Sequence, residues 1–220
     1  MKAFDFRRPS FCGKISHMNK IGLFGGTFNP VHCAHRELAL CAIETLALDR
    51  LFWIPCKPWQ KAGQAIASGE HRTAMIERII AGDSRMAIDT CELDRQGDTY
   101  TIDTIKDFQT RYPNSEIVFL MGSDQWANFH TWKAWETILQ TVRLVIVTRN
   151  GEKSSPNDTV RAFMEKEKID VAFLEMPAMA ISSQEIRDII AKDGPLFDKL
   201  AGKLPRDVID YIATLGLYQH

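Results

Sequence analysis

The 220-residue sequence predicts an α/β fold in which a central parallel sheet is flanked by helices on both faces. Short apolar runs alternate with segments of helical periodicity along most of the chain. The first two runs, residues 21–24 and 51–55, enclose one such helical segment and so form a β-α-β unit. A glycine pair, Gly25-Gly26, directly follows the first run, and glycine turns between a strand and a helix are typical of ligand sites in this fold class.

The elements follow from local patterns. Buried strands are predicted at residues 21–24, 51–55, 86–88, 117–121, 143–147 and 171–174. Helices are predicted over residues 38–46, 70–81, 102–108 and 207–215, with another beginning at Thr159. The run 117–121 is the most apolar and is therefore expected at the centre of the sheet. Residues 148–158 are polar and rich in turn formers, so a mobile loop is expected there.

Composition limits the function classes. A formal net charge of −1 gives no overall attraction to nucleic acid or to an anionic membrane, so neither is an expected partner. No apolar run approaches the roughly 20 residues needed to cross a bilayer. The five cysteines are scattered and lack C-x-x-C spacing, which argues against a disulfide framework and a structural zinc site. A reducing, cytoplasmic location is therefore expected.

The domain organisation is expected to be simple. Residues 1–20 precede the first strand and contain no apolar stretch of signal-peptide length, so we expect a disordered N-terminal extension. Residues 21–220 show no internal repeat, low-complexity tract or break in composition. One domain over residues 21–220 is the simplest interpretation.

Residues 25–35, with the sequence GGTFNPVHCAH, predict a phosphate-binding turn. The glycines remove side-chain bulk, and the N–H groups and dipole of the following helix favour an anion. Asn29 and Pro30 are predicted to begin that helix, as its N-cap and first-turn proline. His32 and His35 are three residues apart, so on a helix they share a face and can donate hydrogen bonds to phosphoryl oxygens.

Residues 56–63 form a second loop that follows a strand. Because parallel strands end at one edge of the sheet, this loop is expected beside the glycine turn. It carries Lys57 and Lys61, each of which is either a phosphate ligand or a solvated charge.

Residues 181–187, with the sequence ISSQEIR, form the second polar motif. Ser182 and Glu185 have the spacing of a capping box, which predicts a well-capped helix. Arg187 lies in the early turns, where the helix dipole disfavours a cation unless an anion also binds there. Serine hydroxyls, free N–H groups and a guanidinium at one helix end are together suited to a triphosphate.

Both motifs resemble signatures of the nucleotidyltransferase superfamily. The first resembles GGTFDPVHxGH, with Asn29 and Ala34 in place of Asp and Gly, and the second resembles ISSTxIR, with Gln184 in place of Thr. Gln60 stands where the family often has a loop histidine. The resemblance implies a Rossmann-like nucleotidyltransferase fold with helices on both faces of the parallel sheet.

Along most of residues 21–218 the chain is similar to bacterial nicotinate-nucleotide adenylyltransferases. The similar stretches are Thr99-Tyr100-Thr101, Gly122-Ser123-Asp124, Phe129-His130-Thr131-Trp132, Glu136-Thr137-Ile138-Leu139 and the terminal Gly-Leu-Tyr. The resemblance implies transfer of the adenylyl group of ATP to nicotinate mononucleotide, giving deamido-NAD and pyrophosphate in NAD biosynthesis. The 5′-phosphate of the mononucleotide would attack the α-phosphorus in line.

The same resemblance implies the site residues. The catalytic residues would be His32, His35 and Arg187. ATP would be bound by Gly25, Gly26, Thr27, Phe28, His32, His35, Gly122, Asp124, Ile181, Ser182, Ser183 and Arg187. The mononucleotide would be bound by Thr99, Tyr100, Thr101, Asp124 and Trp132, with Trp132 stacking on the pyridine ring and Thr101 near the carboxylate. The cofactor would be Mg²⁺, held mainly by phosphates and water because the sequence shows no dedicated carboxylate cage.

Alternative functions remain open on the sequence alone. A sibling adenylyltransferase would use another phosphorylated acceptor, such as nicotinamide mononucleotide, phosphopantetheine or glycerol phosphate. A non-catalytic nucleotide-binding regulator is suggested by the four departures from the signatures, which are Asn29, Ala34, Gln60 and Gln184. A class I aminoacyl-tRNA synthetase has a similar pair of histidines, but the chain is short for one. The oligomeric state is not set by these patterns.

Overall fold

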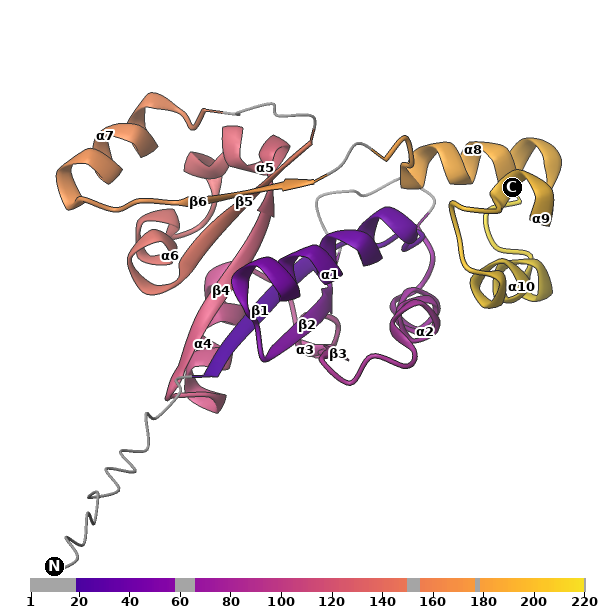
Figure 1. Ribbon diagram of the computed structural model, residues 1–220, viewed down its shortest axis with the longest axis horizontal. Coiled ribbons are helices and arrows are strands. Elements are labelled where there is room, and N and C mark those ends of the chain that lie inside the picture. Colours follow the sequence, from indigo (N-terminus) through magenta and orange to yellow (C-terminus); the bar gives the residue numbers. More distant parts are fainter. Residues whose placement is uncertain (1–18, 58–65, 150–154, 177–178, 220) are drawn as a thin grey trace, which may run out of the picture.

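Six strands form one parallel sheet in the order β3-β2-β1-β4-β5-β6 (Figure 1). The computed structural model describes residues 19–57, 66–149, 155–176 and 179–219. The strands are β1 (Asn19–Gly26), β2 (Arg50–Pro55), β3 (Met86–Ile88), β4 (Ser115–Gly122), β5 (Arg143–Arg149) and β6 (Ala172–Met176). All six strands predicted from apolar runs are confirmed, and β1 and β4 form the centre of the sheet.

The helices lie on both faces of this sheet, as predicted. They are α1 (Cys33–Leu46), α2 (Gly69–Ile80), α3 (Cys91–Asp94), α4 (Thr101–Arg111), α5 (Ser123–Ala127), α6 (Trp135–Thr141), α7 (Asp158–Glu167), α8 (Ser183–Asp193), α9 (Phe197–Leu200) and α10 (Arg206–Leu215), with a short 3-10 helix η2 (Phe129–Thr131). The short helices α3, α5, α6, α9 and η2 were not predicted, because seven residues or fewer give too little periodicity to detect.

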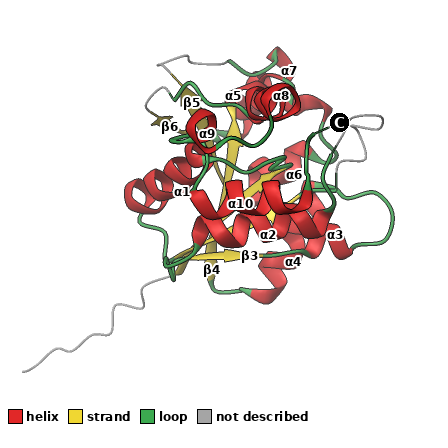
Figure 2. Ribbon diagram, turned by 90° about the vertical axis from the view of Figure 1, so that its right-hand side faces the viewer, coloured by secondary structure: helices red, strands yellow, loops and turns green. Residues whose placement is uncertain are grey.

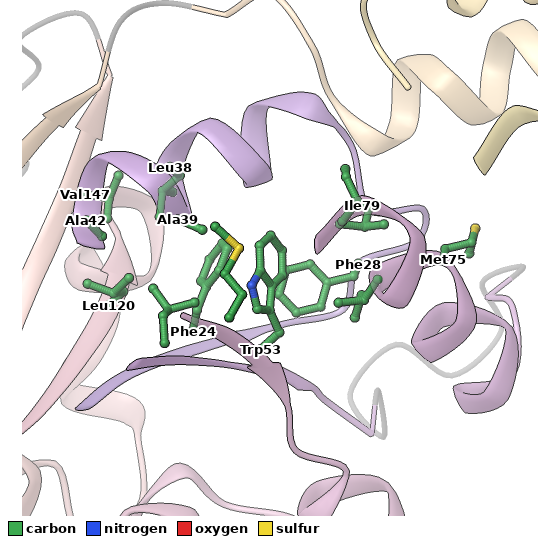
Figure 3. Close-up of a cluster of buried hydrophobic side chains, with 14 of the residues drawn as sticks. Phe24, Phe28, Leu38, Ala39, Ala42, Trp53, Met75, Ile79, Leu120 and Val147 are labelled. Carbon is green, nitrogen blue, oxygen red and sulfur yellow. The ribbon is translucent and has the colours of Figure 1, made fainter. Parts of the chain in front are cut away.

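Two apolar cores lie between the sheet and its helices, one on each face of the sheet. Successive strand side chains point to opposite faces, so Leu23 packs in one core and Phe24 in the other. The first core joins the sheet to α1, α2, α8 and α10, and Figure 3 shows part of it. The second core joins the sheet to α4, α5, α6 and α7. Burial on both faces explains why the strands are nearly continuous apolar runs.

The direction of winding reverses between β1 and β4. Gly26 at the end of β1 pairs with Pro55 of β2, and Phe24 pairs with Leu120 of β4 on the other side. The carboxyl ends of β1, β2 and β4 therefore meet at one edge of the sheet. In open α/β sheets, ligands bind at this topological switch point.

Three expectations concern the chain outside the described residues. The loop at 58–63 with Gln60 and Lys61, the middle of the 148–158 segment and most of the N-terminal extension lie there. The extension was predicted to reach residue 20, but Asn19 and Lys20 already pair with β4. No helix in the described part of the chain is long and apolar enough to cross a membrane.

The predicted start of the first helix is wrong. α1 begins at Cys33 with His32 as its N-cap, and Asn29 lies in the preceding turn. Asn29 is 5% exposed, and its Oδ1 accepts hydrogen bonds from the Ala67 backbone N–H (3.0 Å) and the Tyr218 hydroxyl (2.8 Å). Two partly buried partners from distant parts of the chain therefore use the oxygen that a helix N-cap would have used. An amide oxygen accepts both bonds, so Asn is compatible with this position.

A matched pair of substitutions tests the second core. Phe108 on α4 is fully buried and packs on Phe52 with ring centroids 5.1 Å apart, whereas Phe173 on β6 is 49% exposed. Phe108→Ala should lower the free energy of unfolding by about 3–5 kcal/mol because it leaves a cavity. Phe173→Ala should change it by less than about 0.5 kcal/mol. Urea denaturation of both variants measures the difference, and equal losses would contradict the assigned core.

Candidate active site

The turn after β1 uses its two glycines differently. A Cβ at Gly25 would meet no atom within 4 Å, so the absence of a side chain leaves bare backbone at the surface of a cleft. A Cβ at Gly26 would lie 2.8 Å from Cζ of Phe28, so only glycine lets that ring fold back over the turn. Phe28 packs on Trp53 with ring centroids 5.3 Å apart, in the core shown in Figure 3. The Phe28 side chain thus anchors the turn to the core.

The two histidines of the turn are in direct contact. The rings of His32 and His35 stack with centroids 3.7 Å apart. The His32 backbone N–H donates a hydrogen bond to Nδ1 of His35 (3.2 Å). Because Nδ1 accepts this bond, neutral His35 carries its proton on Nε2, which can donate to a ligand. His32 is 2% exposed, so His35 is the histidine that reaches open space.

The N-terminus of α8 packs against the same turn. Ser182 is the N-cap of α8, and its hydroxyl accepts a hydrogen bond from the Glu185 N–H (3.1 Å), as predicted. The Ser183 hydroxyl donates to the carbonyl of Pro30 (2.9 Å). Nη1 of Arg187 donates to the carbonyl of Asn29 (2.7 Å). The two polar motifs, 150 residues apart in the sequence, therefore form one structure.

A small cavity of about 230 Å³ lies where these motifs meet. It is lined by Thr27, Phe28, Asn29, His35, Ile66, Ser183 and Arg187. Its lining includes an imidazole, a hydroxyl and a guanidinium, and no carboxylate is among the lining residues in the described part of the chain. Hydrogen-bond donors and positive charge without a competing carboxylate are suited to phosphate groups.

A larger cleft of about 750 Å³ opens on the other side of the glycine turn. Its lining includes Gly25, Gly26, Thr27, Thr99, Tyr100, Thr101 and Trp132 from the predicted site. It also includes Ile54, Cys56, Lys57, Glu92, Thr104, Phe119, Gln125, Asn128, Thr131 and Lys133. Thr27 lines both spaces, so the small cavity and the large cleft adjoin at this residue.

Only one of the three neighbouring tryptophans reaches the cleft. Trp126 and Trp135 are buried in the second core, and Trp132 is half-buried. The Trp132 ring packs on Phe129 and edge-on to Phe119, with centroids 5.6 and 6.2 Å apart. These contacts hold the indole while one side of it faces the cleft.

The N-terminus of α4 also borders the cleft. Tyr100 is the N-cap of this helix; its side chain does not cap the first turn, and the Asp103 N–H donates to the Tyr100 carbonyl (3.0 Å). Lys133 places its ammonium 4.0 Å from the centroid of the Tyr100 ring. A positive charge and the positive end of a helix dipole therefore lie at the same end of the cleft.

Glu92 is a site residue that the sequence analysis missed. Its Oε1 accepts a hydrogen bond from the Thr104 hydroxyl (2.9 Å), which itself accepts one from Nη1 of Arg95 (3.2 Å). Lys57 donates to the Arg95 carbonyl (3.1 Å), which ties the loop after β2 to this group. Burial raises the pKa of the Glu92 carboxyl. The sequence signal is weak, because a single Glu in a short helix looks like any surface charge.

Several predicted ATP ligands line neither the small cavity nor the large cleft. Ile181 and Ser182 precede α8, Gly122 is the last residue of β4, and Asp124 lies in the first turn of α5. A Cβ at Gly122 would lie 2.6 Å from Oδ1 of Asp124, so glycine lets this exposed carboxylate fold back over the strand end. The ligand roles of these four residues stay predictions.

The chain is similar to known proteins over most of its length. A family model described as cytidylyltransferase-like matches residues 23–189. A relative from Bordetella petrii, named "Probable nicotinate-nucleotide adenylyltransferase", is 38% identical over 92% of this chain and 100% of its own length. A relative of the same name from Corynebacterium glutamicum is 33% identical over 93% of this chain and 91% of its own length.

Solved structures show the same fold. The Plasmodium falciparum nicotinic acid mononucleotide adenylyltransferase complexed with NaAD superposes with a TM-score of 0.69 at 23% identity, over 91% of this chain and 97% of that one. The same enzyme complexed with APC superposes with a TM-score of 0.68. With the sequence matches, which cover nearly the whole chain, these findings show that the chain belongs to the cytidylyltransferase-like family and, within it, to the nicotinate-nucleotide adenylyltransferases.

Proposed function

We propose that this enzyme transfers the adenylyl group of ATP to nicotinate mononucleotide and releases pyrophosphate and deamido-NAD, a step of NAD biosynthesis. The observation that carries the proposal is the junction at Thr27 of a donor-rich cavity and an aromatic cleft, at the ends of β1 and β2. Adenylyl transfer needs one site for a polyphosphate and one for a flat acceptor, side by side. Curated relatives 33–38% identical to the chain carry this activity in their names.

In this proposal the large cleft binds the mononucleotide. The pyridine ring stacks on Trp132, whose indole is held by its contacts with Phe119 and Phe129. The carboxylate of the acceptor lies at the N-terminus of α4, near Thr101, where the helix dipole attracts an anion. Tyr100 and Thr99 complete this wall of the cleft.

The small cavity binds phosphate groups of ATP. His35 donates from Nε2 to the α-phosphate, while Ser183 and Arg187 hold the phosphates that leave. The 5′-phosphate of the mononucleotide attacks the α-phosphorus, and the bond from that phosphorus to the bridging oxygen breaks as pyrophosphate departs. The attacking phosphate is already anionic at neutral pH, so the reaction requires positioning and charge stabilisation rather than a general base.

His32 supports this arrangement from the interior. Its backbone N–H fixes the tautomer of His35, and its buried ring stacks on the His35 ring. The remaining predicted ligands of ATP, including Asp124 for a sugar hydroxyl, belong to the same proposal.

Magnesium is proposed to enter as part of the ATP substrate. Among the residues that the structure describes, no group of three or more His, Cys, Asp or Glu side chains is arranged to hold a metal ion. The neutral and cationic lining of the small cavity is compatible with an ion held by phosphates and water. Bound there, the ion would neutralise charge on the triphosphate.

A cytoplasmic location is part of the proposal. It is supported by Cys33, Cys41, Cys56 and Cys91, which are free thiols in the structure.

Pyrophosphate release from ATP and Mg²⁺, measured in parallel with nicotinate and nicotinamide mononucleotides, tests the proposed function. A strong preference for the acid is expected, because the N-terminus of α4 and Lys133 favour a carboxylate. Release with the amide alone would identify a sibling transferase. ATP binding without release would indicate a non-catalytic regulator.

Substitution of His35 tests the assigned donor. His35→Ala should lower kcat by about 10²–10³-fold, as expected for loss of one donor to the developing charge. His35→Gln should retain more activity than His35→Asn, because the amide nitrogen of Gln comes closer to the position of Nε2. Steady-state kinetics of the three variants, with unfolding curves as a control, measure this. An Ala variant with near-normal kcat would exclude the role.

Substitution of Trp132 tests the acceptor site. Trp132→Ala should raise KM for the mononucleotide by about 10- to 100-fold, because stacking on an aromatic ring is worth about 1–3 kcal/mol. Trp132→Phe should restore most of this affinity, and the dissociation constant for ATP should not change. The proposal fails if the Ala variant weakens ATP and mononucleotide binding equally.

A further inference from the structure

Arg72, on α2, is a buried cation behind the active site that the reaction scheme above does not use. The side chain is 2% exposed. Nη1 donates hydrogen bonds to the carbonyls of Thr27 (2.8 Å) and Cys56 (3.0 Å), and Nε donates to the carbonyl of Ala67 (3.0 Å). Its partners are therefore three backbone oxygens from three different segments.

Arg72 forms no ion pair with a carboxylate among the described residues. In the part of the chain that the structure describes, none of the ion pairs involves this guanidinium. Arginine is rarely buried unless a carboxylate or another anion pairs with it, because removing a charge from water is costly. Burial lowers the pKa of Arg72, which shows that its surroundings disfavour the charged form. The burial of this charge therefore requires a functional explanation.

Two of the three carbonyls belong to residues that line the active site, and the third is next to one that does. Thr27 lines both the small cavity and the large cleft, and Cys56 lines the cleft. Ala67 follows Ile66, which lines the small cavity, and the Ala67 N–H donates to the side chain of Asn29. Arg72 thus lies directly behind the turn where the two spaces adjoin.

The orientation of these carbonyls has a chemical consequence. In a trans peptide unit the C=O and the next N–H point in opposite directions. Since the Thr27 carbonyl points at Arg72, the N–H of Phe28 points away from it, and Phe28 lines the small cavity. Holding the carbonyl therefore turns a backbone donor outwards. Helix α2 is itself anchored, because it packs on α10 (Figure 2) and His71 Nδ1 lies 2.9 Å from the Tyr211 hydroxyl.

We propose that Arg72 is a positioning residue for adenylyl transfer. It orients the turn through the carbonyls of Thr27 and Cys56. It also supplies a permanent positive charge that attracts the phosphates of the bound nucleotide. The inference rests on the proposed function, since it assumes that polyphosphate binds in the small cavity. Arg72 itself does not touch the substrate. It acts through the turn and through its electric field, because the protein between Arg72 and the cavity screens a charge less than water does.

Binding of tripolyphosphate, ATP and adenosine to the intact protein, measured by calorimetry, tests this role. Arg72→Met should weaken tripolyphosphate binding by about 10- to 100-fold, the range expected when a hydrogen-bonded charge is lost. Arg72→Lys keeps the charge and should stay within about fivefold of the unmodified protein. Adenosine has no phosphate and should bind all three forms equally.

The chain offers a matched control on the same helix. Arg78 donates to its own helix at Ala74 (2.6 Å) and lies over the ring of Tyr211, with Cζ 4.1 Å from the centroid. Arg78→Met removes the same charge from α2 without touching the site, and it should leave tripolyphosphate binding unchanged. If Arg72→Met does not fold, Arg72→Gln replaces it, because its amide still donates to one carbonyl but carries no charge.

Three results would overturn the proposal. These are unchanged tripolyphosphate binding in the neutral variant, equal losses in the Lys and neutral variants, and a parallel loss of adenosine binding. Since tripolyphosphate binding is measured without turnover, a failure of adenylyl transfer is seen separately. Protein that binds tripolyphosphate through Arg72 but releases no pyrophosphate would refute the proposed function and leave only the role of Arg72 in phosphate binding.

Discussion

The active site depends on the parallel pairing of β1 with β2 on one side and β4 on the other. This pairing places the ends of three strands at one edge of the sheet, where the direction of winding reverses. Three segments begin at that edge: the glycine turn, the loop after β2 and helix α5. The backbone N–H of Cys56 donates to the carbonyl of Gly26 (2.9 Å), so the pairing continues into the loops themselves.

Three side chains hold carbonyls of the turn after β1. Arg187, Ser183 and Arg72 donate to the carbonyls of Asn29, Pro30 and Thr27, respectively. The peptide nitrogen after Asn29 belongs to Pro30 and carries no hydrogen, but the N–H groups of Phe28 and Val31 point away from the carbonyls that precede them. The turn thereby gains a fixed shape in which the N–H of Phe28, a residue that lines the small cavity, is directed away from Arg72.

The two halves of the site differ in chemistry. The small cavity has donors and a guanidinium and suits phosphates, whereas the large cleft combines Trp132 and Phe119 with the lysines Lys57 and Lys133. Glu92 lies in the same cleft, and burial raises the pKa of its carboxyl. In the proposed function, acceptor specificity and stabilisation of the transferred group are assigned to separate elements, which adjoin at Thr27.

The sequence by itself determined the parallel sheet, the glycine turn, the histidine pair and the capped start of α8, because each depends on residues close together in the chain. It misjudged Asn29, since the local preference for an N-cap lost to partly buried partners at Ala67 and Tyr218. It gave no sign that Arg72 and Glu92 are buried beside the site. Only the tertiary structure decided this, because the surroundings of a buried charge are distant carbonyls and hydroxyls that folding brings around it.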